Sequence, residues 1–220
     1  MARRPKQLEL PTPPTWGGRR KGAGRPKSGR PVGVAHRSRP LHRAAHPVHV
    51  TLRAVREVGS LREIRVAVAL RDAITVAHKP GFRVVHFSIQ SNHVHFIVEG
   101  HDRDALTRGV QGLAIRLARA VNRATEHAGR VWGDRYHARA LSSPRETRIC
   151  IVYVLQNHRP RGGRGGAPDP LSSGGYFDGW RDWKPPARDD PPPVRKPRTW
   201  LCDKGWRRLG LISLHEAPAS

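Results

Sequence analysis

Short stretches in which apolar and polar residues alternate predict four β-strands, because successive side chains point to opposite faces of a strand. The first stretch covers residues 48–53, where valine and leucine alternate with histidine, threonine and arginine. Residues 83–89 and 93–99 are the second and third, and the short Ser91-Asn92 turn between them predicts a hairpin. A fourth strand is expected around residues 136–141.

Apolar positions at three- and four-residue spacing predict two helices between these strands. Ser60 and Glu63 have the spacing of a capping box, so a helix should begin there and end near Ala77. A longer helix is expected from about Asp102 to Glu126. The apolar positions expected in the two helices are Ile64, Val68 and Ile74, followed by Leu106, Val110, Leu113, Leu117 and Val121.

A third helix is predicted by the start signal around Pro144. Ser143 and Glu146 again have capping-box spacing, and proline is favoured at the first helical position. Tyr153 and Asn157 are four residues apart and therefore share one face of this helix. They could supply a nucleophile and a neighbouring ligand. Alternatively, Tyr153 packs at the core with its hydroxyl at the surface, and Asn157 caps the helix.

The order of elements indicates an α+β fold. The sequence β-α-β-β-α-β with an additional helix is typical of a ferredoxin-like split βαβ arrangement, an antiparallel sheet with helices on one face. We expect a basic disordered arm over residues 1–45, a domain over 46–160 and a Gly/Pro/Arg-rich extension over 161–220.

In the second strand, alternation places Val85, Phe87 and Ile89 on one face.

The third predicted strand carries two histidines on one face. His93, His95 and Ile97 alternate with apolar residues, so the two imidazoles could grip one divalent ion. A His-x-His pair is by itself a weak signal, and two half-exposed strand histidines are the alternative.

The histidine pair and the capped helix with Tyr153 and Asn157 together resemble the single-tyrosine HUH transposases of the bacterial insertion-sequence type. The chain is most similar to the REP-associated tyrosine transposase branch, whose members often carry a basic segment like residues 22–26, Gly-Ala-Gly-Arg-Pro. The resemblance covers roughly residues 46–160. The family commonly has proline directly after the asparagine, whereas proline stands three residues later here.

This resemblance implies an activity and its site. His93, His95 and Asn157 would hold Mg²⁺ or Mn²⁺, and Tyr153 would attack the scissile phosphate to leave a 5′-phosphotyrosine. The implied partner is single-stranded hairpin or repeat-end DNA. Related enzymes can exchange tyrosine helices within a homodimer, so Tyr153 could serve the histidines of its own chain or of a partner.

The charge balance favours a polyanionic partner. The 220 residues hold 41 Lys and Arg against 17 Asp and Glu, a net charge of +24. A G+C-rich genome would explain the preference for arginine but not this net charge. Residues 1–45 contain twelve Lys or Arg and one acidic residue. The expected DNA contacts are Arg25 and Arg30 in two Gly-Arg-Pro segments, and Arg108, Arg116, Arg119 and Arg123, which could also form only a solvated helix face.

The C-terminal extension begins with Arg-Gly-Gly repeats at 161–166, which are typical of a flexible linker. Its aromatic residues, including Phe177 and Trp180, could stack on bases but more often pin such a tail to the core. The two cysteines indicate neither a disulfide framework nor a cysteine zinc site. With no apolar run of membrane-spanning length and no signal peptide, we expect a cytoplasmic, nucleoid-associated protein.

Two other functions remain open. The first is a non-catalytic DNA- or RNA-binding protein derived from a transposase, since RNA-recognition modules share this fold. The second, a histidine-triad nucleotide hydrolase, would need a further histidine at the position of Ile97.

Overall fold

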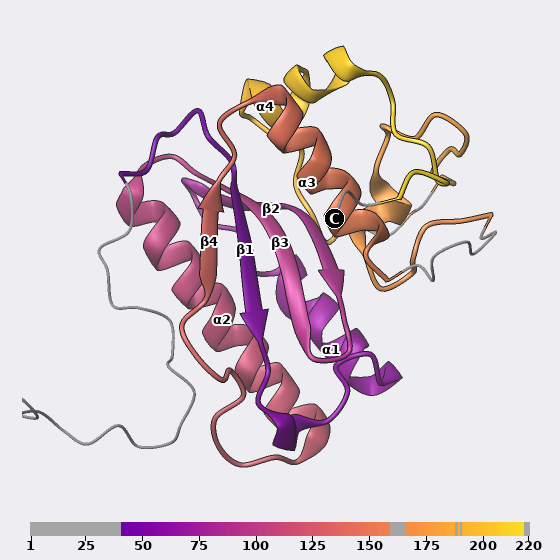
Figure 1. Ribbon diagram of the computed structural model, residues 1–220. Coiled ribbons are helices and arrows are strands. Elements are labelled where there is room, and N and C mark those ends of the chain that lie inside the picture. Colours follow the sequence, from indigo (N-terminus) through magenta and orange to yellow (C-terminus); the bar gives the residue numbers. More distant parts are fainter. Residues whose placement is uncertain (1–40, 159–165, 188, 190, 218–220) are drawn as a thin grey trace, which may run out of the picture. The chain divides into compact units, whose positions relative to one another are not determined.

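The computed structural model describes residues 41–158, 166–187, 189 and 191–217 (Figure 1). Its centre is a four-stranded sheet in the order β2-β3-β1-β4, in which all neighbouring strands are antiparallel. This confirms the split βαβ arrangement. The strands are β1 (Val48–Arg53), β2 (Phe82–Ile89), β3 (His93–Gly100) and β4 (His137–Ala140).

Helices α1 (Ile64–Thr75) and α2 (Arg103–Thr125) cover one face of the sheet (Figure 1). The buried side chains between these helices and the sheet include Val50, Phe96 and Leu117. Helix α2 begins as expected, because the Asp102 side chain accepts a hydrogen bond from the Ala105 N–H. The long amphipathic helix predicted from the sequence is therefore confirmed. Within the described residues, no helix has the length and apolarity needed to cross a membrane.

The other face of the sheet is covered by α3 (Pro144–Gln156) and by the C-terminal extension. Ile97 packs with α3 and with the buried aromatic rings of Phe177, Trp180 and Trp206. The expectation that aromatic residues pin the tail to the core is confirmed at Phe177 and Trp180. The extension contributes the short helices η2 (Ser173–Tyr176), α4 (Trp200–Asp203) and η3 (Gly205–Leu209).

The second strand departs from simple alternation. Its pairing with β3 shifts between Val84 and His86, which marks a β-bulge. Because the bulge adds one residue, Val85 faces α3 whereas Phe87 and Ile89 face α1 and α2. The prediction that Val85, Phe87 and Ile89 share one face was wrong.

The start of α1 was also predicted wrongly. The helix has Glu63 at its N-cap, with no side-chain capping bond, and the Glu63 carboxylate accepts from Arg65 instead. The Ser60 hydroxyl accepts from the Arg62 N–H before the helix begins. The helix is correspondingly rotated: Ile64 and Val68 are exposed, and its buried residues are Val66, Ala67, Leu70, Ala73 and Ile74. A short helix η1 (Arg56–Val58) precedes it.

A buried carboxylate ties the C-terminal extension to the end of β3. Glu99 accepts hydrogen bonds from the Arg198 and Thr199 N–H groups at 2.8 and 3.0 Å and from the Thr199 hydroxyl at 2.8 Å. The Arg83 guanidinium lies 3.6 Å from the same carboxylate. A buried charge is stable only when it is paired and hydrogen-bonded, so these partners must stay in place for Glu99 to remain buried.

We predict that Glu99→Gln lowers the free energy of unfolding by about 3 kcal/mol, because it leaves Arg83 and an amide donor without a charged acceptor. Limited proteolysis should also cut the segment around residue 198 more readily. Denaturant unfolding and peptide mapping measure the two effects. Glu63→Gln is the matched control, since its ion pair with Arg65 is exposed and should contribute less than about 1 kcal/mol. Equal effects of the two substitutions would contradict this role of Glu99.

Candidate active site

The pairing of β1 with β3 brings polar side chains from two strands onto one face of the sheet. Thr51 lies opposite His95 and Arg53 opposite His93, so all four side chains point to the face that α3 covers. His49, two residues before Thr51, points the same way.

The rings of His93 and His95 converge through one nitrogen each. Their Nε2 atoms lie 2.9 Å apart. The His93 Nδ1 lies 2.7 Å from the Asn92 Oδ1, so its N–H donates to that amide oxygen. The His95 Nδ1 lies 3.1 Å from the Thr51 hydroxyl and 3.2 Å from the His49 Nε2. These partners allow both Nδ1 atoms to carry the proton, and in that tautomer the two Nε2 lone pairs face a common point.

The environment keeps these imidazoles neutral near pH 7. Burial, followed by the neighbouring His93 and His49, lowers the pKa of His95 to about 3. Burial and the charge of Arg139 lower the pKa of His49 to about 4. Burial and the charge of Arg53 also lower the pKa of His93. A neutral imidazole has the free lone pair that a metal ligand requires.

The histidine pair fits a divalent ion. Two ligands at right angles, each about 2.1 Å from an octahedral ion, are about 3.0 Å apart, close to the observed Nε2 separation. Metal-binding histidines usually donate their second N–H to a neighbouring acceptor, as the Asn92 contact provides for His93. Among the described residues, no group of three His, Cys, Asp or Glu side chains could hold a metal ion.

Tyr153 lies directly beside this histidine pair in the same chain. Its ring centroid is 5.0 Å from that of His95 and 5.9 Å from that of His49, with both histidine rings edge-on. The placement follows from α3, whose neighbouring Ile151 and Val154 are buried against the sheet while Tyr153 remains half-buried at the margin. The position of Tyr153 at the margin of the core is therefore observed, and its role as a nucleophile stays a prediction.

The start of α3 agrees with the sequence prediction only in part. The Ser143 hydroxyl accepts from the Glu146 N–H, and Pro144 occupies the first helical position. The Glu146 carboxylate does not complete the box on Ser143, because it accepts from the N–H and hydroxyl of Ser142.

Asn157 lies at the C-cap of α3, one turn beyond Tyr153. It remains half-buried, and within the described residues no hydrogen bond joins it to His93 or His95. The preceding residue, Gln156, is buried and donates to the Ser213 carbonyl at 2.8 Å, so it faces the C-terminal extension. The structure thus brings together the two histidines and the tyrosine, and it places the asparagine at the helix C-cap, as one of the two sequence alternatives predicted.

The predicted DNA-contacting arginines are separate from this site. Those of α2 are exposed, and α2 covers the sheet face opposite to the histidines. Arg25 and Arg30 lie outside the described residues. The four predicted arginines of α2 are Arg108, Arg116, Arg119 and Arg123.

Sequence analysis gave no role to three residues that contact the histidine pair. His49 and Thr51 could have been found from the alternation in β1, which places them on one face, had the register against β3 been known. Asn92 adjoins His93 in sequence, but its role depends on the turn that directs its amide back to the ring.

Comparisons with known proteins find similar solved structures and a matching family model. Comparison with curated proteins finds no match. Among solved structures, a REP-associated tyrosine transposase bound to a REP hairpin is 15% identical with a TM-score of 0.47, covering 56% of this chain and 72% of that one. A crystal structure of a Deinococcus radiodurans R1 protein described as a transposase is 18% identical with a TM-score of 0.39, covering 53% and 94%.

The family model described as "Transposase IS200 like" matches residues 45–157. The match spans 113 of the 220 residues, and it contains the histidine pair, Tyr153 and Asn157. The chain belongs to the family of IS200-like transposases.

Proposed function

We propose that this transposase is a metal-dependent enzyme that cleaves and rejoins single-stranded or hairpin DNA through a 5′-phosphotyrosine intermediate. The observation that carries the proposal is the Tyr153 ring packed against His95, whose Nε2 converges with that of His93. A nucleophile beside a pair of neutral nitrogen ligands is a suitable arrangement for phosphoryl transfer.

In the proposed reaction the Tyr153 oxygen attacks the scissile phosphorus. A bond forms between the phenolic oxygen and phosphorus while the bond from phosphorus to the 3′ oxygen breaks. The phenol loses its proton, and the departing 3′ oxygen takes up a proton to become a hydroxyl. Attack by a 3′-hydroxyl on the phosphotyrosine reverses these steps, so rejoining requires no nucleotide cofactor.

His93 and His95 would hold Mg²⁺ or Mn²⁺ at their Nε2 atoms, and Asn157 is the proposed third ligand. When bound, the ion supplies positive charge that offsets the charge developing on the phosphate and favours ionisation of the phenol. Thr51, His49 and Asn92 would orient the two rings through their Nδ1 atoms, which supports binding through Nε2.

The proposed substrate is a hairpin or repeat end of a DNA strand. The net charge of +24 supports a phosphate-rich partner. The exposed arginines of α2 are proposed to contribute DNA contacts outside the site. Because Tyr153 packs on the histidines of its own chain, the arrangement supports cleavage within one protomer.

We predict that Tyr153→Phe abolishes a covalent adduct between the protein and single-stranded hairpin DNA in the presence of Mn²⁺, because it removes the attacking oxygen. The adduct should carry the new 5′ end, which gel analysis of 5′- and 3′-labelled strands distinguishes. Tyr136→Phe and Tyr176→Phe are matched controls that should retain the adduct. His93→Ala and His95→Ala should lose cleavage while retaining most DNA affinity.

Persistence of the adduct in Tyr153→Phe would disprove the assignment of the nucleophile. Absence of any adduct from the native protein with hairpin and repeat-end strands would favour the alternative, a DNA-binding protein without catalysis.

A second prediction concerns the residues that orient the histidines. Thr51→Val and Asn92→Ala should each weaken Mn²⁺ binding by about 10- to 100-fold, because each removes a hydrogen-bond partner that orients one imidazole. Titration of the protein with Mn²⁺, followed by the signal of the free ion, measures the affinity without any reaction. Thr125→Val is the matched control, since the Thr125 hydroxyl donates to the Val121 carbonyl within α2, on the opposite side of the sheet from the histidines. An unchanged affinity in Thr51→Val and Asn92→Ala would contradict this orienting role.

A further inference from the structure

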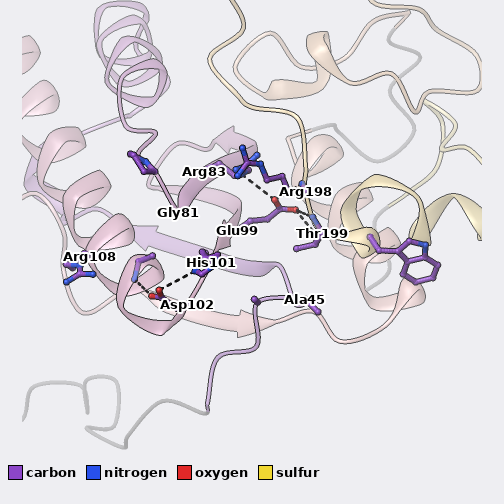
Figure 2. A pocket seen from close by; sticks show the side chains of 14 residues that line it. Ala45, Gly81, Arg83, Glu99, His101, Asp102, Arg108, Arg198 and Thr199 are labelled. Atoms are coloured by element: carbon purple, nitrogen blue, oxygen red, sulfur yellow. Dashed lines mark hydrogen bonds and ion pairs between the residues drawn. The ribbon is translucent and has the colours of Figure 1, made fainter.

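A basic groove lies at the end of the sheet where β2 begins and β3 ends. It consists of two adjoining cavities of about 750 and 470 Å³, which share Pro80, Arg83 and Arg198. Glu99 lies four residues beyond His95 in β3, a rise of about 13 Å, so the groove is separate from the histidine pair. Figure 2 shows Arg83, Arg198 and Thr199 gathered around Glu99, with Arg108 on another wall.

One wall is a segment of the C-terminal extension, residues 193–199, which we call the basic strap. Hydrogen bonds along its length fix its backbone to the core, among them one from the Arg83 guanidinium to the Lys196 carbonyl at 3.3 Å. The Pro193 carbonyl lies 3.0 Å from the His78 Nε2, and the Arg195 N–H donates to the Val84 carbonyl at 2.9 Å. Glu99 holds the far end through the N–H groups described above.

The His78 contact is well defined chemically. The Val84 N–H points at the His78 Nδ1 at 3.3 Å, so Nδ1 accepts and Nε2 carries the proton donated to Pro193. Val194 and Thr199 are buried, whereas Arg195, Lys196 and Arg198 between them are exposed. The strap is therefore an irregular segment with buried anchors and outward cations at fixed positions.

The groove has an excess of positive charge. Lys79 and Arg108 belong to the core side, and the strap adds Arg195, Lys196 and Arg198. Within the part of the chain that the structure describes, none of these five side chains takes part in an ion pair. Of the acidic groups, Glu99 is already satisfied by Arg83 and the strap, and Asp102 caps α2.

We propose that this groove binds the sugar–phosphate backbone of a DNA strand. Cations spaced along two adjoining cavities match a row of phosphates better than a single small anion. Because the strap is already fixed, it loses less conformational entropy on binding than a mobile basic tail would. The inference rests on the proposed function in its choice of DNA, and it assigns a binding site outside the catalytic group.

The test compares two triple variants of the full chain in the Tyr153→Phe background, without added divalent metal, so that binding is measured without cleavage. R195Q/K196Q/R198Q removes the cations of the strap. R65Q/R145Q/K184Q is the matched control, because it also removes two arginines and one lysine that are exposed elsewhere. Fluorescence anisotropy with labelled single-stranded and hairpin DNA gives the affinity at several salt concentrations.

The salt slope is the magnitude of the slope of the logarithm of the binding constant against the logarithm of the salt concentration. Loss of three phosphate contacts should reduce it by about 2, which corresponds to about 100-fold weaker binding near 0.1 M salt. The control should keep a slope close to that of the parent protein. A double variant on the core wall, K79Q/R108Q, should reduce the slope by about 1.4. Equal slopes for the strap and control variants would overturn the proposal. The adduct assay on the native protein tests the proposed chemistry separately, so the two can fail independently.

Discussion

The register of β1 against β3 is the constraint on which the candidate site depends. Val50 and Phe96 face each other in this pairing and must both point at α1 and α2 to be buried. Side chains alternate, so the same pairing sends Thr51 and His95 together to the opposite face. A slip by one residue would exchange the two sets and bury polar side chains in the apolar core. The hydrophobic core on one face thus fixes the polar group on the other.

The second face of the sheet combines polar and apolar regions, and this division positions the tyrosine. Ile97 lies two residues beyond His95 on the same face and packs with α3. The bulge in β2 adds Val85 to this apolar surface, which regular alternation would have directed elsewhere. Because α3 docks on Ile97 and Val85, Tyr153 at its margin lies against the neighbouring histidines.

Features with local causes were predictable from the sequence, and those with tertiary causes were not. Strand alternation in β1 and β3, the start of α2 near Asp102 and the Ser143-Pro144 start of α3 each depend on a few neighbouring residues, and the structure confirms them. The β2 bulge and the rotation of α1 depend on packing between distant elements. The pair of His93 and His95 was visible as spacing, whereas His49 joins it only through strand pairing. Asn157 lies at the C-cap of α3, which the sequence offered as one alternative, but helical spacing from Tyr153 does not fix its distance to the histidines of the sheet.

The C-terminal extension shows why composition alone is a poor guide to order. Its glycine and proline content suggests an irregular flank, and the backbone is indeed mostly irregular. Irregular backbone can still be fixed where buried side chains accept its N–H groups, as Glu99 does for Arg198 and Thr199. Val194 and Thr199 are buried against the core, and the cationic side chains between them are exposed to solvent. The buried Glu99 carboxylate therefore holds the strap that presents positive charge at the end of the sheet, and the Arg83 guanidinium, 3.6 Å away, compensates the charge of the carboxylate itself.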